Sequence, residues 1–288
     1  MRPNTIRELL RAGRPTYGTH LFSMWPTITE VVGHSKQFDY IEFSGEYAPY
    51  DLFALDNFCR AAELHGLGSM IKLDQEPRTW LAQRAIGAGF QSVLFADVRN
   101  VEQARACVAA ARPDAPGSNG TLGVADRRSS LMNHAGTQHY IDALNDIVVV
   151  LMIEKASAVE QLDEILKVPG VDMVQWGPAD YSMSVGRPGE WYSPEVRKVE
   201  RHVFETCIRA GIPPRLELTA PKQAERYLEM GVRHFCMGTD IYILYDWLRE
   251  NGAELRKLVE AAEGAAPSSA SGGATSGREG AEARPPHA

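Results

Sequence analysis

Two carboxylates follow apolar runs of the sequence, where a buried acid would need a cation as its partner. Glu154 follows seven consecutive apolar residues, 147–153, and Asp180 ends the segment GPAD that follows the next apolar run. Burying a carboxylate is costly unless it is paired or bound to a metal. Two carboxylates completed by water form a typical shell for Mg2+ or Mn2+. The alternative is a structural ion pair between Glu154 and Lys155, Lys72 or an arginine.

Other polar residues occupy comparable positions at the ends of further apolar runs. His20, near the end of the first run, is either a relocated base or, as is commoner for a lone strand histidine, a structural residue. The spacing of Glu217 leaves open whether it faces the same site or pairs near Arg215. The remaining members of this set are Ser44, Gly45, Glu46 and Tyr47, then Lys72 and Asp74, and finally Thr239 and Asp240.

An alternation of strands and helices must position these residues. Short β-branched runs occur at 16–22, 38–43, 68–73, 92–96, 147–153, 171–175, 214–218 and 232–237. Amphipathic helical patterns occur at 52–65, 78–88, 101–111, 139–145, 159–167, 193–210, 221–230 and 241–262. Eight such alternations in about 250 residues predict a (β/α)8 TIM barrel, whose active site lies at the carboxyl ends of the strands. A doubly wound open sheet is the alternative, but no GxGxxG or GxxxxGKS/T motif supports it.

The composition of the 288-residue chain is that of an ordinary globular protein, with 44% hydrophobic residues, 23% charged residues and a net charge of −7. We expect one domain over residues 1–263 and a disordered tail over 264–288, because the tail contains no Leu, Ile, Val, Phe or Tyr. The chain has neither a basic block nor an apolar stretch of membrane-spanning length, which argues against nucleic acid and membrane as partners. An N-terminus without an apolar leader and four widely separated cysteines point to the reducing cytoplasm.

Four segments occur in order within residues 17–260: SGEYAP at 44–49, IEK at 153–155, GPADYS at 177–182 and MGTD at 237–240. Together they resemble the HpcH/HpaI aldolase/citrate lyase family, specifically its 2,4-dihydroxyhept-2-ene-1,7-dioate aldolase branch. In that family the first and third segments read DGEHAP and GPADLS. The resemblance implies a (β/α)8 barrel of the phosphoenolpyruvate/pyruvate-enolate type.

The resemblance also implies a metal centre. In this family a glutamate and an aspartate hold a divalent metal that binds pyruvate and stabilises its enolate. These ligands correspond to Glu154 and Asp180, with Mg2+ or Mn2+ expected and Co2+ as a further candidate. Glu46 is expected to orient a metal-bound water. The residues implied in substrate binding are Ser44, then Gly177 and Ala179 through their backbone amides, and Arg128 with its neighbour Arg127, which either bind a distal carboxylate or phosphate or are solvated.

The sequence departs from the family pattern in the proton-handling half of the site. The aspartate and histidine of the family's acid/base pair are Ser44 and Tyr47 here, and the arginine that contacts the keto oxygen is Lys72. A free tyrosine is a poor base at neutral pH but can donate a proton. Tyr47 is therefore expected as the proton donor or as a rim aromatic that shapes the pocket. Lys72 is expected as an electrostatic substitute for arginine, as a salt-bridge partner or as a Schiff-base nucleophile.

These observations predict a metal-dependent carbon–carbon lyase, a class II aldolase that acts through a pyruvate-type enolate on a small 2-oxo (hydroxy) acid. One alternative is decarboxylation, or decarboxylative condensation, of an oxaloacetate-like substrate in specialised metabolism, because loss of CO2 makes the enolate without a strong base. The other is a catalytically silent barrel that serves as a binding subunit, against which the retention of Glu154 and Asp180 argues. By resemblance the chain forms a homo-oligomer, from dimer to hexamer, through the apolar helix expected at 241–262.

Overall fold

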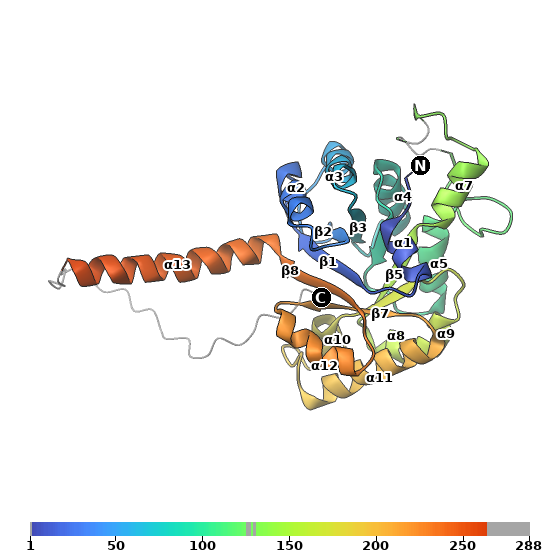
Figure 1. The fold of residues 1–288 in the computed structure, drawn as a ribbon. Coiled ribbons are helices and arrows are strands. Elements are labelled where there is room, and N and C mark those ends of the chain that lie inside the picture. The colour runs from blue at the N-terminus through green and yellow to red at the C-terminus, as the bar shows by residue number, and fades with distance from the viewer. Residues whose placement is uncertain (1, 125–127, 129–130, 264–288) are drawn as a thin grey trace.

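The strands of this chain close into a parallel barrel. The structure is a computed structural model that describes residues 2–124, 128 and 131–263. Its strands pair in the order β1-β2-β3-β4-β5-β6-β7-β8, β8 closes onto β1, and helices surround the outside (Figure 1). The predicted (β/α)8 barrel is confirmed. The tail over 264–288, predicted to be disordered, lies outside the described residues.

Each strand coincides with one of the apolar runs to within two residues at either end. A strand of a parallel barrel is covered on both faces, so its sequence is a nearly continuous apolar run rather than an alternation. The strands are β1 (Thr16–Leu21), β2 (Tyr40–Ser44), β3 (Gly68–Leu73), β4 (Ser92–Phe95), β5 (Val148–Ile153), β6 (Met173–Trp176), β7 (Pro214–Leu218) and β8 (His234–Thr239).

The helices match the predicted pattern less closely than the strands do. The sequence does not predict α1 and α10, which have only seven residues each, or α2, which is rich in the poor helix formers Thr and Val. The helix predicted at 159–167 is two helices, α8 and α9. The helices are α1 (Thr5–Arg11), α2 (Pro26–Ser35), α3 (Leu52–Leu64), α4 (Arg78–Ala88), α5 (Val101–Ala111), α7 (Gln138–Asn145), α8 (Ala156–Glu160), α9 (Leu162–Leu166), α10 (Pro178–Ser184), α11 (Pro194–Ala210), α12 (Ala224–Glu229) and α13 (Asp240–Ala262), with a 3-10 turn at Pro221–Gln223.

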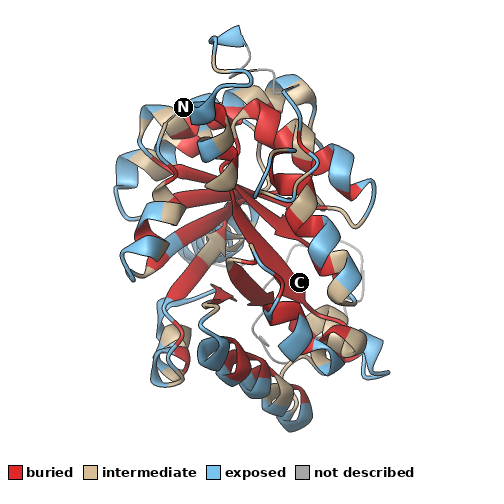
Figure 2. Ribbon diagram, turned by 90° about the vertical axis from the view of Figure 1, so that its right-hand side faces the viewer, coloured by how far each residue is buried: buried red, intermediate tan, exposed pale blue. Residues whose placement is uncertain are grey.

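Two apolar clusters form the core, and the strands at its centre are buried (Figure 2). The larger cluster lies between the strands and the helices, where the ring of Phe58 contacts those of Phe43 and Phe90. The smaller cluster lies inside the barrel and comes mainly from β3 to β6, through Met70, Leu94, Val150, Met152 and Met173. The interior wall formed by β7, β8, β1 and β2 carries buried charged side chains instead, among them Arg215, His20 and Glu42.

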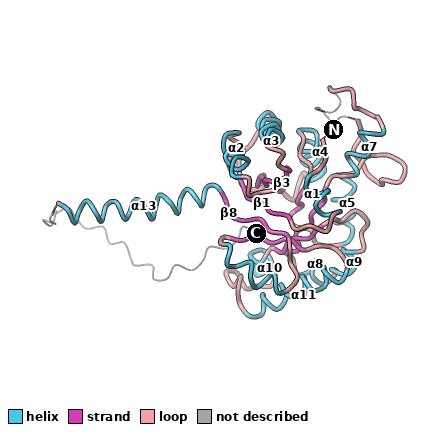
Figure 3. The backbone as a smooth tube through the Cα atoms, viewed as in Figure 1, coloured by secondary structure: helices cyan, strands magenta, loops and turns pink. Residues whose placement is uncertain are grey.

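The last described helix, α13, leads away from the barrel (Figures 1 and 3). None of its 23 residues is buried. Over the described ranges, every helix is too short or too polar to cross a membrane. All four cysteines are buried and unpaired, as the sequence predicts. The exposed apolar side chains of α13 are Ile241, Ile243, Leu244, Tyr245, Trp247, Leu248, Leu255, Leu258 and Val259.

Candidate active site

Four polar side chains lie at one level of the barrel, close to the mouth formed by the carboxyl ends of the strands. His20, Lys72, Gln175 and Glu217 are the penultimate residues of β1, β3, β6 and β7. All four are buried. Because parallel strands of a barrel end together at one mouth, these side chains form the floor of a shared site.

Lys72 is a buried cation among these four residues. Its ammonium lies 2.8 Å from the Glu46 carboxylate and donates a hydrogen bond of 3.0 Å to the Tyr47 hydroxyl. Burial alone would lower the pKa of Lys72, but the surrounding Tyr47, Glu46 and Glu154 outweigh burial and raise the pKa above its ordinary value. Lys72 is therefore an ammonium ion rather than the neutral amine that a Schiff-base nucleophile requires.

Tyr47 lies at the rim above Lys72. Its side chain is 45% exposed, and its ring stacks on Phe22 with the centroids 6.0 Å apart. Burial of the phenol raises the pKa of Tyr47 above its ordinary value, despite the opposing effect of Lys72. The phenol is hydrogen-bonded to the Glu46 carboxylate, whose own pKa is raised by burial. Tyr47 thus keeps its proton, and the geometry is compatible with either of its expected roles.

Glu154 lies directly after β5 and is 2% exposed. Its Oε1 accepts a hydrogen bond of 2.7 Å from the backbone N–H of Asp97. Burial raises the pKa of Glu154 to about 7. Within the described part of the chain, the Glu154 carboxylate forms no ion pair. Gly177 packs so closely against it that an added Cβ would lie 2.6 Å from Oε2, so this position requires glycine.

Asp180, in the first turn of α10, is paired with a lysine. The Nζ atom of Lys155 lies 2.5 Å from Asp180 and 2.5 Å from Asp97. This contact corrects the alternative in which Lys155 pairs with Glu154. The sequence prediction omitted Asp97, although its place after the apolar run 92–96 is the same signal that identified Glu154. Asp97 and Asp180 both act electrostatically on Glu154, so three acids surround this part of the mouth.

The interior wall of β7, β8, β1 and β2 holds a chain of alternating charges. Arg215 is fully buried, pairs with Glu42 and donates from Nε to the Tyr40 hydroxyl at 2.7 Å. The other oxygen of Glu42 lies 2.8 Å from Nε2 of His20, and a Glu217 oxygen lies 3.3 Å from the same nitrogen. Guanidinium, carboxylate, imidazole and carboxylate therefore follow one another along the wall. Each buried charge has a partner of opposite sign, as burial requires.

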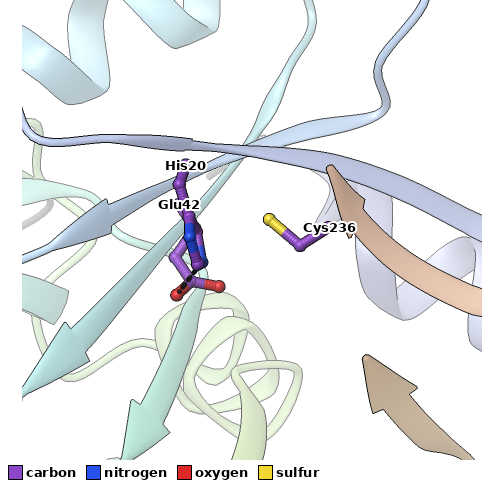
Figure 4. A group of neighbouring side chains, drawn as sticks. All are labelled: His20, Glu42 and Cys236. Atoms are coloured by element: carbon purple, nitrogen blue, oxygen red, sulfur yellow. Dashed lines mark hydrogen bonds and ion pairs between the residues drawn. The ribbon is translucent and has the colours of Figure 1, made fainter. Parts of the chain in front are cut away.

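His20, Glu42 and Cys236 also form a group of metal-ligand types (Figure 4). One donor atom from each lies within 4.8 Å of the others. Imidazole, carboxylate and thiolate are ligands of zinc-like metals. Burial alone would lower the pKa of His20, but Cys236, Glu217 and Glu42 outweigh burial and raise it, so the imidazole holds a proton. A metal ion here would compete with that proton and with Arg215 for Glu42.

The residues expected to bind substrate near the mouth differ in their placement. Ser44 is fully buried at the end of β2, and its Oγ has no hydrogen-bond partner among the described residues. Gly177 donates its N–H to the carbonyl of Ile153 at 3.2 Å, so its amide is occupied and the expectation that it binds substrate is corrected. Ala179 lies in the first turn of α10, where N–H groups have no acceptor within the helix.

Arg128 lies at the opposite end of the barrel. Its guanidinium pairs with Glu63 near the end of α3 at 2.7 Å and donates to the carbonyl of Ala88 at the end of α4 at 2.9 Å. These helix ends lead into the amino ends of β3 and β4. Arg128 therefore cannot contact a substrate at the mouth, and its predicted role is wrong. Arg127, its predicted companion, lies outside the described residues.

The chain is similar to known aldolases over most of its length. The HpcH/HpaI aldolase/citrate lyase family matches residues 17–245. The 4-hydroxy-2-oxo-heptane-1,7-dioate aldolase of Klebsiella pneumoniae subsp. pneumoniae is 31% identical over 84% of this chain and 89% of its own. The hydroxypyruvate/pyruvate aldolase of Agrobacterium fabrum is 29% identical over 88% of this chain and 94% of its own.

Solved structures show the same barrel. An HpcH/HpaI aldolase/citrate lyase family protein from Burkholderia cenocepacia has a TM-score of 0.80 at 26% identity, covering 88% of this chain and 100% of that one. The citrate lyase beta subunit from M. tuberculosis, complexed with oxaloacetate and magnesium, has a TM-score of 0.52 at 11% identity, covering 80% and 93%. The chain therefore belongs to the HpcH/HpaI aldolase/citrate lyase family of carbon–carbon lyases.

Proposed function

We propose that this protein is a metal-dependent class II aldolase that works through a pyruvate-type enolate on a small 2-oxo acid. One observation carries the proposal: Glu154 is a buried carboxylate without an ion-pair partner among the described residues, and it lies beside Asp97 and Asp180 at the barrel mouth. A buried acid in this position is stabilised by a cation. The names of the relatives, aldolases of 4-hydroxy-2-oxo-heptane-1,7-dioate and of hydroxypyruvate and pyruvate, support the reaction class.

Glu154 and Asp180 are the residues that would hold a divalent metal, Mg2+ or Mn2+, with Co2+ as a further candidate. Their carboxylate oxygens are the donors that these metals prefer. The raised pKa of Glu154 marks a desolvated acid, whose ionised form a metal cation would favour. The same fold holds magnesium in the M. tuberculosis protein. When bound, the metal supplies positive charge that polarises the substrate ketone and stabilises the enolate.

The chain's own residues contribute charge and hydrogen bonds. The Lys72 ammonium attracts the negative charge that develops on the enolate oxygen, in place of the family's arginine. Glu46 holds that ammonium at 2.8 Å, and its orientation of a metal-bound water stays a prediction. Tyr47, which keeps its phenol proton, donates a hydrogen bond at the rim. The Ser44 hydroxyl and the Ala179 N–H are the donors that we assign to the substrate carboxylate.

Deuterium exchange at the methyl group of pyruvate tests this function, because exchange requires the enolate. The loss of the methyl signal is followed by proton NMR in D2O with and without Mg2+. We expect metal-dependent exchange in the wild type, its loss in Glu154→Gln, and a slower rate in Tyr47→Phe. Absence of exchange in the wild type with both Mg2+ and Co2+ would contradict the proposal.

One specific observation favours a decarboxylative reaction as the second candidate. Ser44 and Tyr47 replace the family's acid/base pair, and an enolate made by loss of CO2 does not need a base. Metal-dependent CO2 release from oxaloacetate, without exchange on pyruvate, would support this alternative. If neither reaction occurs and millimolar Mg2+ does not bind, the barrel is a silent binding subunit.

We further propose that the chain assembles into a homo-oligomer through α13. This helix exposes Trp247, Leu248 and Leu255 to solvent, which is unfavourable for large apolar side chains in an isolated chain. The barrel wall beside β1 and β8 carries a mainly apolar groove, lined in part by Tyr17 and Phe235. A second copy of α13 is the occupant that we assign to this groove.

A further inference from the structure

The proposed chemistry lacks a proton acceptor among the residues assigned so far. Lys72 and Tyr47 both keep their protons, so they act as donors. Glu46 forms an ion pair of 2.8 Å with Lys72 and is hydrogen-bonded to Tyr47. Glu154 and Asp180 are the proposed metal ligands. Removing a proton from a methyl carbon, or from a hydroxyl group, nevertheless requires a positioned base.

Glu217 carries a free acceptor atom on this floor. Its Oε1 accepts a hydrogen bond from Nε2 of Gln175 and lies 3.3 Å from Nε2 of His20. Its Oε2 is buried and has no hydrogen-bond partner among the described residues. Buried polar atoms without partners are rare in native proteins. One oxygen of Glu217 is therefore held by protein groups, while the other is a buried acceptor whose hydrogen-bonding capacity the described residues leave unused.

Glu217 and Lys72 occupy equivalent positions near the ends of their strands and interact electrostatically. The two are penultimate residues of β7 and β3, and Glu217 contributes, with Glu154, to the electrostatic environment of the Lys72 ammonium. Arg215, two residues earlier on β7, and the protonated His20 are further cations in the electrostatic environment of Glu217. The Lys72 ammonium and the Glu217 carboxylate therefore lie at the same level of the barrel, close to its mouth.

We propose that Glu217 is the catalytic base and acid of this enzyme, with His20 and Gln175 as its positioning residues. This inference rests on the enolate chemistry proposed above. The family's acid/base pair comes from the segment after β2, whereas this pair of an imidazole and a carboxylate comes from β1 and β7. Ser44 and Tyr47 replace the family's acid/base pair, and proton transfer is then moved to another part of the barrel mouth rather than lost.

The steps balance for cleavage of a 4-hydroxy-2-oxo acid. The O–H bond at C4 breaks and its proton moves to Oε2 of Glu217, while the electron pair left on oxygen forms the aldehyde carbonyl. The C3–C4 bond breaks, its electron pair forms the C2–C3 double bond, and the ketone π pair moves onto the oxygen near Lys72. Glu217 then returns the proton to C3, which gives the methyl group of pyruvate.

The test uses pyruvate as the probe in the full chain. Methyl exchange in D2O with Mg2+ is compared in the wild type, Glu217→Gln, Glu217→Ala and the matched control Glu200→Gln, which alters a buried carboxylate on α11 outside the barrel. We expect the exchange rate to fall by about 10²-fold or more in both Glu217 variants, the range of general base catalysis. We also expect added formate to restore part of the rate in Glu217→Ala, an unchanged rate in Glu200→Gln, and Mn2+ binding in Glu217→Gln equal to that of the wild type.

The outcomes separate this inference from the proposed function. If the wild type exchanges and Glu217→Gln exchanges at a similar rate, Glu217 is not the base, although the enolate chemistry stands. Failure of formate to restore exchange in folded Glu217→Ala would also overturn the inference, since a purely structural role is not rescued by a small carboxylate. If the wild type does not exchange with Mg2+ or Co2+, both proposals fail together. Should Glu217→Gln not fold, Glu217→Asp keeps the charge, and its expected result is a slower, not abolished, exchange.

Discussion

The ammonium of Lys155 lies 2.5 Å from the carboxylate of Asp180, one of the two proposed metal ligands. A metal ion at Asp180 must therefore compete with a lysine that is also held by Asp97. A lysine in this position weakens cation binding, because two positive charges would share one carboxylate. Lys155 would thus lower the affinity of the proposed site for a metal without being a ligand itself.

Replacing Lys155 with Met is expected to tighten Mn2+ binding. The repulsion removed corresponds to at least about tenfold in Kd, or ~1.4 kcal/mol. Calorimetric titration of the metal-free protein measures the change, with Lys167→Met as the control, since Lys167 pairs with Glu164 on the surface. An unchanged Kd in Lys155→Met would mean that Asp180 does not bind the metal.

Lys72 is expected to be essential for enolate formation through its charge. In Lys72→Met the buried cation is lost, and we expect pyruvate exchange to fall by about 10²–10³-fold, as for the loss of a preorganised donor to a developing oxyanion. The free energy of unfolding is expected to fall by roughly 1–3 kcal/mol, because Glu46 loses its partner. Lys72→Arg, which restores the family's guanidinium, is the matched variant.

NMR exchange and urea unfolding are the two measurements for these Lys72 variants. Lys72→Arg keeps the positive charge but not the shape of the ammonium group, so we expect partial deuterium exchange on pyruvate. Lys72→Met has no charge, so we expect almost no exchange. Wild-type exchange in Lys72→Met would remove Lys72 from the reaction altogether.

The fold could be predicted from the sequence because barrel strands are short, buried on both faces and separated by helices. The run 147–153 identifies β5 (Val148–Ile153) with an error of one residue. The short helices α1 and α10 could not be predicted, because seven residues give too few turns for an apolar stripe to be recognised. The start of α1 is set by a cap, in which the Asn4 side chain accepts a hydrogen bond from the N–H of Arg7.

The sequence could predict those features of the candidate site that depend only on the position of a residue along its strand. Glu154 and Lys72 are buried at strand ends, as their apolar context indicates. Partner choice was not predictable, because it depends on which neighbouring strand faces each side chain. Lys155 pairs with Asp180 rather than Glu154. Arg128 is held at the far end of the barrel by Glu63 and the carbonyl of Ala88.

His234 makes the stability of the barrel depend on pH. It begins β8, and its Nδ1 lies 3.1 Å from the Thr16 hydroxyl. Burial, followed by the nearby Arg215, lowers the pKa of His234 from 6.5 to about 4. The unfolded chain therefore binds a proton in the window from pH 6.5 to 4 that the folded chain does not. The stabilisation is complete above pH 6.5 and is lost as the pH falls to about 4.

A non-titrating variant isolates this contribution. The difference between a pKa of 6.5 and one of about 4 corresponds to about 3 kcal/mol at most. The free energy of unfolding is measured with urea at pH 7 and at pH 4 for both proteins. We expect it to decrease between these pH values by up to this amount more in the wild type than in His234→Gln. The carboxylates that titrate in the same window cancel in the comparison. Parallel pH profiles for the two proteins would show that His234 is not held neutral.

The apolar surface of α13 is expected to be buried between subunits. Trp247 is 61% exposed in the single chain and lies one residue before Leu248 on a helix with no buried residue. Replacing both with Glu leaves the barrel untouched, so we expect a folded monomer with wild-type circular dichroism in place of an oligomer. Sedimentation velocity measures the mass of each form. Lys257→Glu, which changes the charge of the same helix without removing apolar area, should leave the assembly intact. A wild-type chain that sediments as a monomer would contradict assembly through α13.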